Sequence, residues 1–86
     1  MQEEYNFWVY ILTNWKKTVL YVGMTNDLPR RLIQHYENRG KTESFAGRYY
    51  CYNLVYYEWY QYVWDAIIRE KEIKKMLREH KRLFEF

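Results

Sequence analysis

The amino-acid sequence predicts an α+β fold, a three-stranded antiparallel sheet flanked by two to three helices in the order β-β-α-β-α-α. Apolar, β-prone runs lie near the start and in the middle of the chain, glycine and proline follow the first two runs, and the last third has helical spacing. Because the chain has 86 residues and shows no repeat or linker, we expect one domain, 1–86.

The first expected strand is the continuous apolar run from Phe7 to Leu12. A run without polar alternation is typical of a strand that is buried on both faces, so we expect it in the centre of the sheet. Residues 14–17 separate it from a second run, Val19 to Met24. This short separation predicts a hairpin in which the two strands pair antiparallel.

The first helix is expected from about residue 27 to residue 38. Asn26 or Asp27 can cap its N-terminus, and Pro29 lies in the first turn, where proline is tolerated. Helical spacing places three apolar residues on one stripe, Leu28, Leu32 and Tyr36.

The second half of the chain contains a connection, a strand and further helix. Glycine and polar residues dominate 39–48, which indicates a mobile connection, and the run Tyr49 to Trp59 predicts the third strand. Asp65 to Leu77 has helical spacing, with one apolar face made of Ala66, Ile73 and Leu77. Residues 78–86 are expected to continue this helix or to kink into a third one, with three apolar side chains packing back: Leu83, Phe84 and Phe86.

Cysteine usage and the N-terminus indicate a cytoplasmic protein. Cys51 is the single cysteine, so neither an intrachain disulfide nor a cysteine zinc site can form. Glu3 and Glu4 stand where a signal peptide needs positive charge. The longest apolar run is far shorter than the roughly 20 residues of a membrane span, so no membrane association is expected.

The net charge of +3 lies entirely in the last eighteen residues, because residues 1–68 contain seven acidic and seven basic side chains. If the end of the chain is helical, four basic residues form one stripe, Lys71, Lys75, Arg78 and Arg82. Such a stripe can contact phosphates. A solvated helix face interleaved with Glu72 and Glu79 accounts for the same charges, so charge alone leaves both interpretations open.

Glu70 is the unusual residue of the last predicted helix. At 100° per residue it lies within about 60° of the apolar stripe that contains Ala66 and Ile73. Burial of an uncompensated carboxylate costs several kcal/mol or more, so Glu70 needs a cation, a metal or hydrogen bonds. A salt bridge is one structural alternative to a functional role, and a helix rotation that leaves Glu70 at the edge of the stripe is another.

Four other residues can carry chemistry, although each has an ordinary structural explanation. Arg31 offers a planar guanidinium that clamps two phosphate oxygens, or that pairs with a carboxylate such as Glu70. His35, one turn later, can be a base, a proton relay, a metal ligand or a polar residue at the core edge. Tyr10 and Tyr21 lie on the two hairpin strands and can project onto one face, where tyrosine is also common in cores.

Taken together, these residues match a known pattern. Val9-Tyr10-Ile11, followed ten residues later by Leu20-Tyr21-Val22-Gly23, resembles the two motifs that name the GIY-YIG nucleases. The similarity continues to Arg31, eight residues after the glycine, and to His35, and it reaches Leu54 to Glu58 and the helix around Glu70. It covers roughly residues 7–82 and is closest to the small, stand-alone branch called URI-type endonucleases.

The resemblance implies a divalent-metal-dependent endonuclease that hydrolyses DNA, with one Mg2+ or Mn2+ ion held by Glu70. Tyr10 and Tyr21 correspond to the motif tyrosines, Arg31 to the phosphate-clamping arginine and His35 to the histidine of the first helix. The expected catalytic residues are therefore Tyr10, Tyr21, Arg31, His35 and Glu70. The expected DNA contacts are Arg31, Lys71, Lys75 and Arg78. We expect Tyr10 to be the base or water-orienting group, with Tyr21 next and His35 as a proton relay.

So small a module has little surface for reading bases, and its sequence shows no helix-turn-helix, zinc-finger or basic zipper pattern. Structure-selective or weakly specific cleavage, or targeting by a partner protein, is therefore expected; the oligomeric state is left open. The alternative function is a non-catalytic nucleic-acid-binding module with stacking tyrosines and a basic helix. A third interpretation is a protein-interaction domain whose site is idle.

Overall fold

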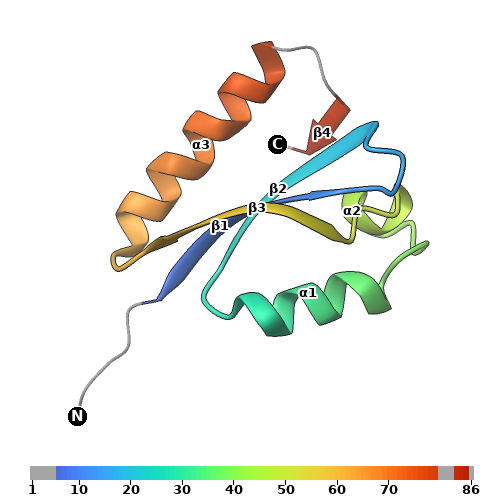
Figure 1. The fold of residues 1–86 in the computed structure, drawn as a ribbon, viewed down its shortest axis with the longest axis horizontal. Helices are drawn as coiled ribbons and strands as arrows, with labels where there is room; N and C mark the ends of the chain where they lie inside the picture. Colours follow the sequence, from blue (N-terminus) through green and yellow to red (C-terminus); the bar gives the residue numbers. More distant parts are fainter. Residues whose placement is uncertain (1–5, 80–82, 86) are drawn as a thin grey trace.

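The computed structural model describes residues 6–79 and 83–85, and it has helices on both faces of one sheet. Figure 1 shows α1 and α2 on one side of the strands and α3 on the other. The elements in chain order are β1 (Phe7–Thr13), β2 (Val19–Thr25), α1 (Leu28–Glu37), α2 (Phe45–Arg48), β3 (Asn53–Tyr60), α3 (Val63–Glu79) and β4 (Leu83–Glu85).

The strands have the order β3-β1-β2-β4, and β1 pairs antiparallel with both β2 and β3. This confirms the predicted α+β class, the three-stranded antiparallel arrangement and the hairpin. It also confirms the internal position of the first strand. In the hairpin register Tyr10 pairs with Gly23 and Leu12 pairs with Tyr21.

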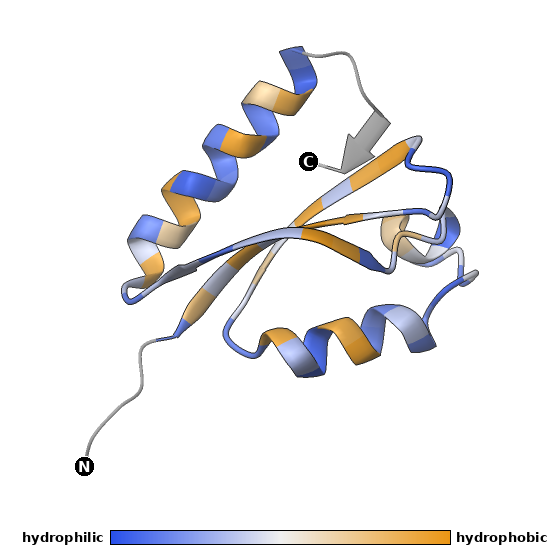
Figure 2. Cartoon of the chain, in the orientation of Figure 1, coloured by the Kyte–Doolittle hydropathy of each residue, from blue (hydrophilic) through white to orange (hydrophobic). Residues whose placement is uncertain are grey.

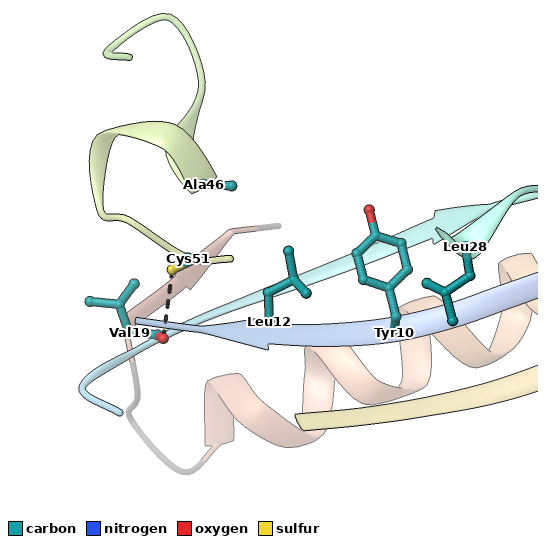
Figure 3. Packing of buried hydrophobic residues seen from close by; sticks show 6 residues of the cluster. All are labelled: Tyr10, Leu12, Val19, Leu28, Ala46 and Cys51. Atoms are coloured by element: carbon teal, nitrogen blue, oxygen red, sulfur yellow. Dashed lines mark hydrogen bonds between the residues drawn. The ribbon is translucent and has the colours of Figure 1, made fainter. Parts of the chain in front are cut away.

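β1 is buried on both faces because its alternate side chains enter two different cores. Val9 packs with Val22 and with Ile73 of α3. Tyr10 belongs to the other core, which Figure 3 shows together with part of α2, while α3 runs on the opposite side of β1. In Figure 2 hydrophobic segments lie along the central strands, and the hairpin loop is hydrophilic. A central strand without polar alternation is the consequence of this two-sided packing.

α1 begins where the sequence predicts, because the Asp27 side chain accepts a hydrogen bond from the backbone N–H of Arg30 at 3.2 Å. Leu28 is buried and Leu32 packs against the same core. Tyr36, expected on the apolar stripe, is instead 49% exposed. Its ring meets that of Tyr52 edge-on, with the ring centroids 5.2 Å apart. The stripe of α1 is therefore narrower than its spacing suggests.

The connection expected at 39–48 contains a short helix that the sequence analysis did not predict. Ser44 caps α2, since its hydroxyl accepts a hydrogen bond from the N–H of Gly47 at 3.1 Å. Ala46 is buried in the core below Tyr10 and Leu12. A single turn of helix has too few residues to show an apolar period, which is why the polar composition of this segment concealed it.

The end of the chain also differs from the prediction of a continued or third helix. Leu83–Glu85 forms β4, which pairs parallel with β2 from Val19 to Tyr21. Without β4, β2 would be an edge strand with unpaired N–H and C=O groups, and a further strand satisfies them. The expected packing of the Leu83, Phe84 and Phe86 side chains lies outside the described residues.

α3 is held against the sheet by apolar contacts and by one ion pair. Ala66 and Ile73 are buried and Leu77 packs beside them, as predicted from their spacing. The guanidinium of Arg69 donates to both oxygens of Glu58 on β3, at 2.9 and 3.1 Å. Arg69, together with hydrogen bonds from neighbouring tyrosines, lowers the pKa of Glu58 to about 2.

The described helices differ in length, but none is long and apolar enough to cross a membrane. The longest, α3, has 17 residues and carries charged residues on its outer face. Its role in the described part of the chain is to cover one face of the sheet.

Candidate active site

The two motif tyrosines point to the same face of the sheet. Tyr10 pairs with Gly23, and Tyr21 lies two residues before Gly23 on the same strand, so both side chains project toward α1. Their ring centroids are 6.2 Å apart. This confirms the expectation that the hairpin brings the two tyrosines together.

Gly23 makes this approach possible. A Cβ atom at position 23 would lie 2.5 Å from the hydroxyl oxygen of Tyr10 and 2.9 Å from Cε2 of Tyr21. Both distances are shorter than van der Waals contact, so any side chain would displace the tyrosines. In the sequence Gly23 is recognisable only as part of a motif, and its packing role follows from the strand register.

His35 projects from α1 onto this pair of rings. Its Nε2 atom lies 2.9 Å from the Tyr10 hydroxyl oxygen. Its ring meets that of Tyr21 edge-on, with the ring centroids 5.2 Å apart. Burial, with a contribution from the nearby charge of Arg31, lowers the pKa of His35 to about 4. The imidazole is therefore neutral at neutral pH and offers one nitrogen as an acceptor.

The proton of the Tyr10–His35 hydrogen bond belongs to the tyrosine. Tyr10 is 1% exposed, and its burial and the nearby Tyr21 raise the pKa of its phenol above the usual range. A protonated phenol can donate to a neutral imidazole, so we infer that Tyr10 donates to Nε2 and that Nδ1 of His35 carries the ring proton.

Arg31 lies one turn before His35, at the opening of the site. It is only partly exposed, and its Nη1 atom donates to Oε1 of Gln34 at 2.9 Å. The nearby hydroxyl of Tyr10 raises the pKa of Arg31, so the guanidinium remains charged. Gln34 was missed by the sequence analysis, although its spacing of three residues from Arg31 places the two side chains together on a helix.

Two hollows meet at Arg31. The smaller has a volume of about 340 Å³, and its walls are Tyr21, Arg31, His35, Asn38, Glu43, Ser44, Phe45 and Ala46. The larger has a volume of about 740 Å³ and is lined by the end of β2, the start of α1 and Phe7. Since Arg31 borders both, an extended ligand that fills them passes its guanidinium. The segment before α2 and the start of α2 form one wall of the smaller hollow.

Glu70 is not part of this group in the described structure. It lies on α3, which covers the opposite face of the sheet, and its side chain is 21% exposed. Its ion pair is with Lys74, one turn later, at 3.6 Å. The structure thus provides the salt bridge considered as an alternative for Glu70, whereas the partner considered for Arg31, Glu70 itself, is replaced by Gln34.

Glu70 offers a single carboxylate to a metal ion. Within residues 6–79 no three His, Cys, Asp or Glu side chains gather into a metal site. Magnesium is commonly held by one or two carboxylates while it keeps several waters, so a lone and partly exposed glutamate suits this ion. The flexible Lys74 is the group with which such an ion would compete.

The basic stripe is exposed on the outer side of α3. Lys71, Lys75 and Arg78 are accessible to solvent, and Arg82 lies outside the described residues. Exposed acidic residues lie among these cations, and one of them, Glu72, forms an ion pair with Arg69 at 3.3 Å. The stripe and the tyrosine cluster therefore occupy different faces of the sheet.

A comparison with protein families gives one match, to the model described as the GIY-YIG catalytic domain, over residues 6–83. This match covers nearly the whole chain and includes every element that carries the cluster. Comparisons with curated proteins and with solved structures give no match.

The neutral state of His35 predicts a loss of stability in mild acid. The pKa of His35 in the folded protein, about 4, is lower than its ordinary value of 6.5. The unfolded chain therefore takes up the proton first as the pH falls. Between pH 6.5 and 4 the free energy of unfolding should decrease by an amount on the order of 3 kcal/mol.

Urea unfolding of the wild type and of His35→Gln across this pH range measures the effect, since the variant lacks the proton-binding group. An NMR titration in a His80→Gln background, where His35 is the remaining histidine, gives its pKa directly. A midpoint near 6.5 would show that the imidazole is not held neutral.

Gly23→Ala tests the close packing beneath the tyrosines. The added methyl group overlaps the hydroxyl of Tyr10 and the ring of Tyr21, so we expect a loss of about 1–3 kcal/mol in unfolding free energy. Equal unfolding free energies for Gly23→Ala and the wild type would contradict the close contact.

Proposed function

Since the chain belongs to the GIY-YIG family of nucleases, we propose that it is a divalent-metal-dependent endonuclease that hydrolyses phosphodiester bonds of DNA. The observation that carries this proposal is the convergence of Tyr10, Tyr21, Arg31 and His35 around one cavity. Structure-selective or weakly specific cleavage is part of the proposal, as is targeting by a partner protein in the cytoplasm.

Hydrolysis of a phosphodiester needs an oriented water, a proton acceptor and positive charge beside the developing anion. Arg31 is the group that holds the non-bridging oxygens, because it is charged, planar and located where the two hollows meet. Its hydrogen bond to Gln34 restricts the guanidinium and so orients it before a ligand arrives.

We assign the water-orienting role to Tyr21 rather than to Tyr10. Tyr21 is partly exposed and lines the cavity, whereas the hydroxyl of Tyr10 is buried and already donates to His35. Tyr10 then acts as a positioning residue, which holds the imidazole neutral and fixed at the cavity wall. Because Nε2 of His35 accepts from Tyr10 and Nδ1 carries the ring proton, a proton can reach the imidazole only through the Tyr10 hydroxyl, which would pass its own proton to Nε2 as it takes one up.

Glu70 is the proposed ligand of the ion, Mg2+ or Mn2+. When bound, such an ion supplies Lewis-acid stabilisation of the leaving oxygen. The carboxylate oxygens of Glu70 are the kind of ligand that a hard cation prefers. The side chain of Glu70 is partly exposed, and its ion-pair partner is the flexible side chain of Lys74. The ion pair between Arg69 and Glu58 fixes the helix turn that carries Glu70.

Cleavage of a panel of duplex, nicked, flapped and branched DNAs, with magnesium, manganese or chelator, tests this function. Glu70→Gln should abolish cleavage and leave DNA binding within a few-fold, because it removes the charge of the metal ligand and keeps its shape. Its unfolding free energy should change by less than about 1 kcal/mol, as expected for a partly exposed ion pair. Glu79→Gln, an exposed neighbour on the same helix, is the matched control.

Normal cleavage by Glu70→Gln would remove Glu70 from the mechanism. Binding without cleavage of any DNA by the wild type would instead favour the non-catalytic nucleic-acid-binding module.

Arg31→Lys should reduce the single-turnover rate about 100-fold or more although the charge is retained, because an ammonium cannot hold two oxygens in one plane. The affinity for DNA should change less than the rate. Arg39→Lys provides the comparison, since Arg39 is exposed and lines neither hollow. If both variants cut at the wild-type rate, Arg31 has only its structural contact with Gln34.

We propose that the α3 stripe contributes sequence-independent phosphate contacts. Replacement of Lys71, Lys75 and Arg78 together by glutamine should weaken binding to unrelated sequences alike. It should also flatten the slope of log affinity against log salt by about two to three units if all three residues touch phosphate. A salt titration measures the slope, and an unaltered slope would show that the stripe is only a solvated face.

A further inference from the structure

The hairpin between β1 and β2 presents a tryptophan to solvent. Trp15 is 72% exposed, although an indole is among the largest apolar groups that a fold can bury. It stands at the tip of the loop, followed by Lys16 and Lys17, and the ammonium of Lys16 lies 5.4 Å from the centre of its ring. No part of the proposed reaction uses these three residues.

The loop that carries Trp15 is held by its own hydrogen bonds. The side-chain oxygen of Asn14 accepts from the N–H groups of Thr18 and Val19, at 2.9 and 3.1 Å. The side-chain amide of Asn14 donates to the hydroxyl of Thr18 at 2.8 Å, and the backbone carbonyl of Asn14 accepts from the N–H of Lys17 at 2.9 Å. A loop closed in this way presents its side chains in a defined place, which lowers the entropy cost of binding.

The hairpin itself carries charge of one sign. From Phe7 to Asn26 the chain contains two lysines, Lys16 and Lys17, and no acidic residue. On the neighbouring segment the two basic residues Lys41 and Arg48 are exposed, as is one acidic residue, Glu43, so basic residues remain in excess. The end of the sheet that carries the hairpin therefore attracts anions.

The same end of the sheet adjoins the cavity. Val19, directly after the loop, packs in one core with Ala46 and Cys51, and the Sγ atom of Cys51 lies 3.7 Å from the Val19 carbonyl oxygen (Figure 3). Ala46 also lines the cavity that contains Tyr21 and Arg31. In Figure 1 the hairpin loop accordingly lies beside α2.

From this arrangement we propose that the hairpin tip is a second nucleic-acid contact, which binds an unpaired base on Trp15 and its flanking phosphates on Lys16 and Lys17. An aromatic face with adjacent cations is the combination that binds single strands without reading their sequence. The preferred substrate is then DNA with single-stranded character next to the scissile bond. This inference rests on the proposed function and specifies its substrate class.

The test is binding in the presence of EDTA, so that no metal-dependent cleavage occurs, to a fluorescent oligothymidine and to a blunt duplex of equal length. Trp15→Ala should weaken binding of the single strand about tenfold and change duplex binding by less than about twofold. Trp15→Phe, which keeps an aromatic face, should restore most of the affinity. Lys16→Gln with Lys17→Gln should flatten the salt slope for the single strand by about one to one and a half units.

Trp64→Ala is the matched control, because Trp64 is 71% exposed but lies on α3. It should leave both affinities unchanged, and thermal melting checks that each variant is folded. The proposal is overturned if Trp15→Ala binds the single strand like the wild type, if Trp64→Ala loses as much, or if the duplex loses as much as the strand. A fluorescence shift of Trp15 with anionic lipid vesicles, without any effect on DNA binding, would also overturn it by assigning the tip to membranes.

Failure of this proposal is distinct from failure of the nuclease function. Binding that depends on Trp15, together with no cleavage in magnesium or manganese, refutes the catalytic proposal alone. Cleavage with no contribution of Trp15 to single-strand binding refutes the hairpin contact alone.

Discussion

The hydrogen bond between the Tyr10 hydroxyl and Nε2 of His35 is the constraint on which the site depends. Both groups are buried, and a buried polar group without a partner costs about 1–3 kcal/mol, so each requires the other. The bond ties β1 to α1 and fixes the azimuth of the helix. Arg31, one turn earlier, must then lie at the opening of the cavity, and the His35 ring must meet Tyr21. Gly23 permits the arrangement because only a hydrogen atom fits beneath the two phenols.

The central position of β1 divides the molecule into two halves with different tasks. Tyr10 faces α1 and belongs to the side that carries Arg31 and His35, whereas Val9 faces α3 and belongs to the side that carries Glu70. The orientation of α3 depends on its apolar stripe and on the two hydrogen bonds from Arg69 to Glu58. The proposed catalysis by Arg31 and Glu70 would therefore require both helices to keep their places on the sheet, and residues remote from the proposed DNA site would influence the reaction.

The electrostatics of the α1 side suit a polyanion. His35 is held neutral, so Arg31 is the fixed positive charge beside the tyrosines. The hairpin strands carry lysine at their tip and no carboxylate. These features would raise the local concentration of DNA at a cavity whose walls are otherwise tyrosine, histidine and the segment before α2. The α3 stripe, with its interleaved glutamates, is a weaker source of attraction.

The sequence by itself determined the β-hairpin, α1, β3 and α3, because each of these elements has a clear apolar pattern or a helix cap. It also placed Tyr10 and Tyr21 on one face of the sheet, because side chains alternate between the two faces of a strand. It also identified Arg31 and His35 as neighbours through helical spacing. Only the tertiary structure decided that Tyr10 is buried and paired with His35, that Gln34 holds Arg31, and that Glu70 pairs with Lys74 on the other side of the sheet. These contacts join elements or depend on side-chain rotamers, which local patterns do not specify. The helix at 45–48 and the strand at 83–85 were missed for a related reason: both are too short to have a period of their own, and they form where the sheet offers a core to cover or an edge to pair.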